Sequence, residues 1–208
     1  MSRIIETDAD VSAGAAWLAG QDPHLARALV ATGPLPLRRR PDGFSELLSA
    51  IVSQQVSVAS ARAIQTRLLE AGMTSEAAVR AVSEVDLRAL GLSRQKARYA
   101  HALASAAIDY PALRTASDAE VVRTLTAVPG IGVWTAEIYA MFSLGRPDVF
   151  AAGDLALQEA ARVLYDLPER PRERALRERA AAWSPWRSVA ARLLFAYYRV
   201  ARQRDGIT

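Results

Sequence analysis

Apolar residues recur three and four positions apart through almost the whole 208-residue chain, with Pro, Gly, Ser or Asp where the pattern breaks. This spacing places apolar side chains on one face of an α-helix, and the alternation typical of a half-buried strand is scarce. The sequence therefore predicts an all-α protein. The expected helices cover residues 11–19, 23–31, 43–53, 57–71, 75–81, 93–108, 118–126, 132–143, 154–165, 170–182 and 186–202.

The composition narrows the class of protein. The chain has 51% hydrophobic and 23% charged residues, which are ordinary values for a globular protein. Its apolar runs are far shorter than the ~20 residues of a membrane-spanning helix, and its first ten residues lack the apolar stretch of a signal peptide. We therefore expect a cytoplasmic protein without a membrane partner, from a bacterium if the preference for arginine reflects a GC-rich genome.

The side chains that are scarce exclude several kinds of site. Cysteine is absent, which rules out disulfides, zinc–thiolate sites and a cysteine nucleophile. The two histidines, His24 and His101, are far apart, so a transition-metal site is not expected. Lys96 is the only lysine, and the other 25 of the 26 basic residues are arginines. The best internal boundary is the segment Gly33–Asp42 (GPLPLRRRPD). Its triplet Arg38–Arg40 is expected to be solvated, with contact to a polyanionic partner as the alternative. The net charge of +4 favours a polyanionic partner, although many unrelated proteins are as basic.

A short turn of sequence Pro-Gly-Ile-Gly, Pro129 to Gly132, lies between two apolar helical stretches. Its glycines allow a tight turn, and the helix that follows contributes the positive end of its dipole. N–H groups in such a turn bind phosphate without distinguishing the base sequence. Trp134 follows the turn, and Asp154 follows Trp134 by twenty residues. A phosphate-binding turn, an aromatic side chain and a carboxylate together indicate chemistry on DNA.

Six segments resemble the helix-hairpin-helix DNA glycosylase superfamily, and within it the 3-methyladenine DNA glycosylase II type of alkylation repair. They run in family order over roughly residues 40–200. The segments are Ile51–Ser57 (IVSQQVS), Leu90–Ala97 (LGLSRQKA), Val128–Ala136 (VPGIGVWTA), Arg146–Phe150 (RPDVF), Asp154 and Trp183–Ala190 (WSPWRSVA). The turn alone would be weak evidence, because PGIG turns also occur in DNA-binding proteins that are not enzymes.

The resemblance implies two helical lobes within a single glycosylase unit of residues 1–208, with the active site in a cleft between them. One lobe would comprise approximately residues 43–150, and the other approximately residues 1–42 and 151–208. Only about 40 residues precede the matched region. We therefore expect a compact form without the N-terminal β-rich domain of larger relatives, and we expect a monomer.

Asp154 matches the family's catalytic aspartate, which stabilises positive charge on the sugar and orients or deprotonates water. A simpler role is also open, because Asp154 precedes the helical stretch LALQEAARVLY and would cap it. The two roles are compatible. Asp148 competes for the catalytic role but follows a proline, and we expect it to hold a turn. Some relatives have a second acidic residue directly before the catalytic aspartate. This chain has Gly153 there, so we expect no assistance to catalysis from that position.

Trp134 stands where lyase-competent branches of the superfamily have the lysine that forms a Schiff base. Arginine cannot replace that amine at neutral pH, so the resemblance implies a monofunctional enzyme that leaves an abasic site. An indole face favours cationic bases such as 3-methyladenine and 7-methylguanine, although Trp134 could instead belong to the core. Phe195 matches a second pocket aromatic, again with core packing as the alternative. Ile138 replaces an aromatic residue of some relatives, which implies a more open pocket.

The resemblance also assigns residues to the DNA itself. Gln55 matches the residue that fills the gap left by a flipped nucleotide, and Gln54 lies beside it. Both glutamines could instead satisfy backbone groups at a helix break. The backbone N–H groups of Gly130, Gly132 and Thr135 would bind phosphates.

Two further sets of residues complete the matches. Arg94, Lys96 and Arg98 would contact phosphates from a second loop, unless they merely begin a solvated helix. The carbonyl groups of Thr126, Val128 and Ile131 match those that hold a monovalent cation, Na⁺ or K⁺, in the family's hairpin. Such a cation would be structural. Trp183, Pro185, Trp186 and Arg187 match a family signature that we expect to serve in packing.

These matches imply a monofunctional DNA glycosylase that flips and excises alkylated bases from double-stranded DNA and so initiates base excision repair. No cofactor is required, and the absence of cysteine excludes the iron–sulfur cluster of the endonuclease III-like branch. The alternative from a different class is a helix-hairpin-helix protein that binds DNA, or senses lesions, without catalysis. A third hypothesis, a glycosylase/lyase for oxidised bases, is disfavoured by Trp134 and by the lack of lysine outside Lys96. The sequence does not rank the alkylated bases.

Overall fold

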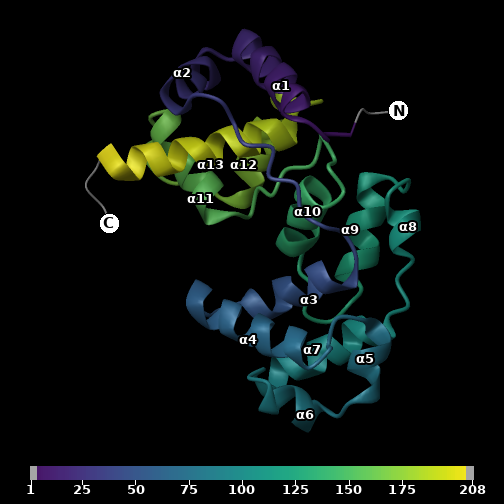
Figure 1. Ribbon diagram of the computed structural model, residues 1–208. Coiled ribbons are helices and arrows are strands. Elements are labelled where there is room, and N and C mark those ends of the chain that lie inside the picture. Colours follow the sequence, from purple (N-terminus) through teal and green to yellow (C-terminus); the bar gives the residue numbers. More distant parts are fainter. Residues whose placement is uncertain (1–3, 205–208) are drawn as a thin grey trace. The chain divides into compact units, whose positions relative to one another are not determined.

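The computed structural model describes residues 4–204, and every regular element within that range is a helix (Figure 1). The all-α prediction is therefore confirmed. The helices are α1 (Asp8–Gln21), α2 (Pro23–Thr32), α3 (Phe44–Ser53), α4 (Val58–Glu70), α5 (Glu76–Ala81), α6 (Glu84–Ala89), α7 (Arg94–Ser105), α8 (Tyr110–Leu113), α9 (Asp118–Thr126), α10 (Val133–Phe142), α11 (Leu155–Leu164), α12 (Glu173–Ala180), the 3₁₀ turn η1 (Ala181–Trp183) and α13 (Arg187–Arg204).

Hydroxyl and carboxyl side chains fix many of the helix starts. Thr7 and Ser117 begin α1 and α9 with capping boxes, in which the cap residue and an acid three positions later satisfy each other's backbone N–H groups. The sequence prediction missed α6 and α8, which have six and four residues. Both follow a capping residue, Ser83 or Asp109, and so short a helix shows too little periodicity to be distinguished from a turn.

Contacts divide the chain into two compact units. The continuous unit comprises Arg40–Tyr139 and contains α3 to α9 with most of α10. The discontinuous unit comprises the residues up to Arg39 and those from Ala140 onward, and contains α1, α2 and α11 to α13. The sequence placed the corresponding borders near residues 42 and 150.

Helix α13 is the central helix of the discontinuous unit and packs against α1, α2 and α11 (Figure 1). Val189 and Leu193 are fully buried and lie four residues apart, so they share one face of the helix. Gly14 permits the close approach of α1, because a Cβ atom there would lie 2.7 Å from the ring of Trp186. A larger residue at position 14 would push these two helices apart.

Helices α3 and α7 pack together in the continuous unit, where Leu47, Ile51 and Leu103 are fully buried. Tyr139, near the end of α10, fixes the entry to α3, because the Gly43 N–H donates a hydrogen bond of 2.7 Å to its hydroxyl oxygen. Burial raises the pKa of Tyr139 to about 12. The hydroxyl therefore stays protonated at neutral pH.

Arg192 of α13 carries a charged side chain in the interior of the discontinuous unit, where only 1% of the residue is exposed. Its guanidinium donates to three backbone carbonyl groups, those of Leu37 (3.1 Å), Ser188 (3.0 Å) and Met141 (3.3 Å). Burial lowers the pKa of Arg192 to about 10, with smaller contributions from Arg38 and Arg39. One side chain thereby ties together three separate segments of the unit.

Replacing Arg192 with Met should lower the free energy of unfolding by about 1–3 kcal/mol, because buried carbonyl groups would lose their donor. Chemical denaturation followed by circular dichroism measures this difference. The matched control is Arg199→Met on the exposed side of the same helix, which should change stability by less than about 0.5 kcal/mol. An equal loss of unfolding free energy in the two variants would show that the hydrogen bonds to the three carbonyl groups do not stabilise the fold.

Candidate functional site

The predicted hairpin is present, formed by α9, the turn Val128–Gly132 and α10. The Ile131 N–H donates to the Val128 carbonyl at 3.1 Å, which closes the turn. The Ala136 N–H donates to the Gly132 carbonyl at 3.0 Å, so α10 starts directly after the second glycine. The first N–H groups of a helix have no carbonyl one turn earlier within that helix, and they form a natural anion site.

Gly130 cannot be replaced without strain, for two separate reasons. Its φ angle is +93°, in the region that favours glycine. A Cβ atom there would also lie 2.4 Å from the ring of Tyr99, which packs directly against the turn. The sequence analysis did not single out Tyr99. Its hydroxyl oxygen accepts a hydrogen bond of 2.5 Å from the side chain of Gln95, one helical turn earlier in α7.

Gln54 joins the IVSQQVS segment to the hairpin. Its side-chain Nε2 donates to the Gly130 carbonyl at 2.8 Å, so it satisfies a backbone group, as one of the two hypotheses for this residue required. Gln55 differs from it, because it is exposed and has a φ angle of +54°. A non-glycine residue in this conformation is unusual and costs energy that the surrounding structure must provide. Gln55 is therefore exposed where Gln54 is engaged, and its predicted role in filling the gap in DNA stays a prediction.

A hollow of about 550 Å³ lies within the continuous unit beside the hairpin. It is lined by Gln54, Gln55 and Val56, by residues at the start of α7 and by the turn Gly130–Gly132. Two motifs that lie 76 residues apart in sequence thus border one concave surface. The sequence predicted both motifs but could not show that they meet.

Lys96 contributes differently from what the sequence suggested. The residue is only 8% exposed, and its Nζ donates to the Val52 carbonyl at 2.7 Å, near the end of α3. Burial lowers the pKa of Lys96. The ammonium group thus holds the end of α3, just before Gln54, and its contact with phosphate stays a prediction. Arg94, at the start of α7, is exposed.

Trp134 is 46% exposed, so the alternative that it belongs to the core is wrong. Thr135, the next residue, is buried and contributes to packing with its side chain. Its predicted phosphate contact concerns the backbone N–H only.

Asp154 belongs to the discontinuous unit and begins α11. Its Oδ1 atom accepts hydrogen bonds from the N–H groups of Ala156 (2.8 Å) and Leu157 (3.2 Å), so the predicted helix cap is present. Gln158 holds the loop before Asp154, because its buried side chain donates a hydrogen bond to the Ala152 carbonyl at 2.9 Å. The carboxylate is therefore held in a defined position on a rigid element.

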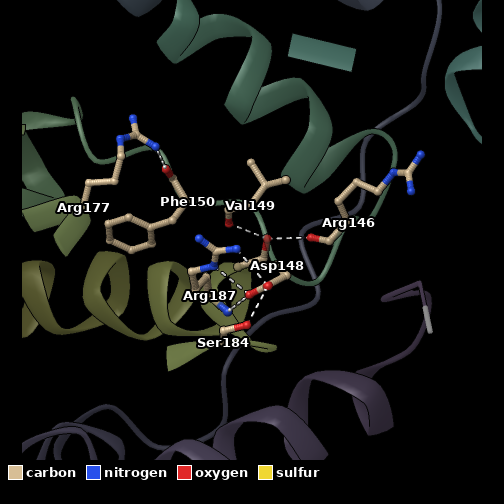
Figure 2. Close-up of polar contacts among 8 residues, drawn as sticks. Arg146, Asp148, Val149, Phe150, Arg177, Ser184 and Arg187 are labelled. Atoms are coloured by element: carbon tan, nitrogen blue, oxygen red, sulfur yellow. Dashed lines mark hydrogen bonds and ion pairs between the residues drawn. The ribbon is translucent and has the colours of Figure 1, made fainter. Parts of the chain in front are cut away.

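Asp148 is bound by the side chains of Arg187 and Ser184, as Figure 2 shows. Its carboxylate accepts two hydrogen bonds from the guanidinium of Arg187, at 2.7 and 2.8 Å, and one from the hydroxyl of Ser184 at 2.8 Å. Burial by itself would raise the pKa of Asp148, but the bonds from Arg187 and Ser184 outweigh it and lower the pKa below its usual value. Asp148 thus holds a turn, as expected, and this ion pair argues against a catalytic role.

Ser188 joins the same loop to the start of α13, because its hydroxyl donates to the carbonyl groups of Arg146 and Val149. Figure 2 labels these two carbonyl residues. Trp183 is 2% exposed and packs edge-to-face on Phe150, with ring centroids 5.4 Å apart. The packing role expected for the WSPWRSVA segment is therefore what the structure shows. This segment fixes the loop that ends at Asp154.

Phe195 is half-buried on α13. Its ring centroid lies 6.4 Å from that of Phe142, and the guanidinium carbon of Arg38 lies 5.9 Å from its centroid. Phe195 is therefore neither a fully buried core residue nor a fully exposed one. Its assignment to a base pocket stays a prediction.

The hairpin carbonyl groups that the sequence assigned to a monovalent cation lie in and beside the turn, and the cation itself stays a prediction. The Val128 carbonyl accepts one hydrogen bond, from Ile131, and within residues 4–204 no backbone N–H donates to the carbonyl of Thr126 or Ile131. A carbonyl oxygen with an unused lone pair is the kind of ligand that Na⁺ or K⁺ accepts. Across the same range, no cluster of His, Asp or Glu side chains fits a metal ion, and no helix is long and apolar enough to cross a membrane.

Comparison with known proteins identifies the family. Residues 48–186 match the sequence profile of the HhH-GPD superfamily of base excision DNA repair proteins. Since this match covers more than half of the chain, the chain belongs to that superfamily.

The chain is also similar to individual DNA repair proteins. The chain is 35% identical, over 209 residues, to a probable bifunctional transcriptional activator/DNA repair enzyme AlkA of Mycobacterium tuberculosis. That match covers 93% of this chain but only 41% of the relative, so the chain spans about two fifths of that protein's length.

Two solved structures show the same fold. A DNA-3-methyladenine glycosidase of Bacillus halodurans is 33% identical with a TM-score of 0.79, and the match covers 89% of this chain and 88% of that one. The 3-methyladenine DNA glycosylase Mag1 of Schizosaccharomyces pombe, in complex with abasic DNA, is 28% identical with a TM-score of 0.76. That match covers 88% of this chain and 94% of the other.

Replacing Asp148 with Asn should lower the free energy of unfolding at pH 7 by about 1–3 kcal/mol, since the charged hydrogen bonds to Arg187 would be lost. Because the folded pKa of Asp148 lies below its unfolded value, this contribution is present above about pH 4 and is lost as the pH falls through the folded pKa. Denaturation of wild type and variant at pH 7 and pH 3 measures the difference, which should shrink at pH 3.

The matched control is Glu178→Gln, which breaks an exposed ion pair with Arg174 and should have little effect at either pH. A difference between wild type and Asp148→Asn that is as large at pH 3 as at pH 7 would contradict the ionic origin of the effect.

Proposed function

We propose that this protein is a monofunctional DNA glycosylase that excises alkylated bases, such as 3-methyladenine and 7-methylguanine, from double-stranded DNA. The observation that supports it most is the pairing of two features in one chain of the HhH-GPD superfamily. The first is a phosphate-binding hairpin followed by a half-exposed tryptophan. The second is a rigidly held aspartate at the start of a helix.

The chemistry requires a carboxylate near the sugar. When the bond between base and sugar breaks, positive charge develops on the sugar ring, and a fixed negative group stabilises that transition state. Asp154 would serve this role and would orient or deprotonate the attacking water. Because the helix cap fixes Oδ1, the carboxylate needs little reorganisation when charge develops.

The base must leave the stack before it can be cut, since the sugar carbon is inaccessible within the duplex. Gln55 would fill the gap left in the duplex, and its amide could hydrogen-bond the orphaned partner base. The N–H groups of Gly130, Gly132 and Thr135 would bind phosphates, and a monovalent cation held by the hairpin carbonyl groups would add positive charge there. Arg94 would add a side-chain contact to a phosphate.

Substrate choice would begin with Trp134. A cationic base such as 3-methyladenine is attracted to an indole face by about 0.5–2 kcal/mol, and Phe195 would add a second aromatic surface. The positive charge of such a base already weakens its bond to the sugar, so one carboxylate and a stacking surface are sufficient chemistry. We expect the protein to act as a monomer on DNA in the bacterial cytoplasm.

Incubation with DNA pretreated with a methylating agent should release free methylpurines, detected by chromatography, and leave alkali-sensitive abasic sites. Borohydride should trap no covalent enzyme–DNA adduct, because the position of the reactive lysine is Trp134 and Lys96 is buried against Val52. DNA binding without base release would favour the non-catalytic alternative, and a trapped adduct would favour a lyase.

A further inference from the structure

Gly153, which directly precedes Asp154, has a carboxylate beside it that comes from another helix of the same unit. A Cβ atom at Gly153 would lie 3.4 Å from Oε2 and 3.6 Å from the carboxyl carbon of Glu173, in the first turn of α12. These are ordinary van der Waals distances, so the Glu173 carboxylate lies where the side chain of a larger residue 153 would begin. The position that has no acid of its own is therefore next to one.

Arg177 holds the Glu173 side chain in this place. Its Nη2 donates to Oε1 of Glu173 at 2.8 Å, across one turn of α12. Its Nη1 donates to the Phe150 carbonyl at 3.4 Å (Figure 2). Arg177 thereby joins α12 to the loop that runs from Phe150 to Asp154. The oxygen of Glu173 that approaches Gly153 is Oε2, the one that this ion pair does not use.

A simpler role for Glu173 is to stabilise its own helix. An acid in the first turn favours the helix dipole, and an exposed ion pair four residues apart adds little more. Glu178 and Arg174 form such a pair in the same helix, at 2.9 Å. This role accounts for an acid at the start of α12, but it does not require the carboxylate to reach the residue before Asp154.

We propose that Glu173 assists Asp154 in base excision by adding a second negative charge beside the start of α11. The inference rests on the proposed function and deepens it. Positive charge that develops on the sugar is stabilised by fixed negative groups nearby, and the effect weakens with distance and with exposure to water. The Glu173 side chain is 55% exposed, so its contribution is modest. Asp154 would remain the catalytic residue, with Glu173 as a supporting charge.

The test is the single-turnover rate of 3-methyladenine release from methylated DNA at saturating enzyme. Glu173→Gln removes the charge and keeps the size of the side chain, and it should lower the rate by about three- to tenfold without weakening DNA binding. The matched control is Glu178→Gln, which makes the same charge change and breaks a similar ion pair in the same helix. It should change the rate by less than about twofold.

A rescue experiment separates the charge from a structural role. Gly153 does not have a positive φ angle, and a Cβ atom there makes only ordinary contacts, so position 153 can accept an aspartate. Adding Gly153→Asp to Glu173→Gln returns a carboxylate to the same place and should restore the rate to within about twofold of wild type. Adding Gly153→Asn instead should restore nothing, because asparagine carries no charge.

Melting temperatures show whether each variant folds. If the double variants do not, Glu173→Lys replaces them, because reversing the charge should lower the rate further than Glu173→Gln does. An unchanged rate in Glu173→Gln, an equal loss in Glu178→Gln, equal rescue by asparagine, or a Glu173→Lys rate no lower than that of Glu173→Gln would overturn the inference and leave the proposed function intact. A wild type that releases no base would overturn the proposed function, and this inference with it.

Discussion

The discontinuous unit depends on one buried charge. Its chain leaves the unit after Arg39 and returns at Ala140, and Arg192 binds a carbonyl group next to each of these points, those of Leu37 and Met141, as well as one in its own helix. Burying a guanidinium is costly, and here three carbonyl groups and the ring of Phe142 offset the cost. Apolar side chains could fill the same volume. They could not, however, donate hydrogen bonds to the backbone at the two places where the chain leaves and re-enters the unit. The position of Arg38 follows from this contact, because its backbone neighbour is one of the three carbonyl groups.

The hairpin and the loop before Asp154 share one property. In each, hydrogen bonds from neighbouring side chains hold the backbone in a fixed conformation. In the continuous unit, Gly130 packs on Tyr99 and its carbonyl accepts a hydrogen bond from Gln54, so the hairpin turn is held in place. In the discontinuous unit, Asp148 and Arg187 fix the loop that ends at Asp154. Both keep the reacting groups on helix starts, where the backbone adds favourable charge for an anion.

Much of the fold was predictable, because helix periodicity and capping residues act locally. The hairpin, the cap at Asp154 and the turn at Asp148 were all visible in short windows of sequence. The contacts that were not predicted join distant residues: Lys96 to Val52, Gln54 to Gly130, and Arg192 to Leu37. A buried lysine or arginine looks like a surface residue in sequence, since its burial depends on carbonyl groups far away in the chain. Trp134 shows the reverse case, an apolar side chain that sequence alone could place in the core but that the structure leaves half exposed.

We propose that Asp154 is the catalytic carboxylate of a glycosylase and more than a helix cap. The most direct test is the single-turnover rate of 3-methyladenine release by Asp154→Asn, with the affinity for DNA measured in parallel. Asparagine can still accept the hydrogen bonds that cap α11, so folding and DNA binding should be retained. Loss of the charge should lower the rate by about 10²-fold or more, the scale seen when one electrostatic contact to a transition state is removed. A variant that binds DNA normally and releases the base at a rate close to that of the wild type would contradict the assignment.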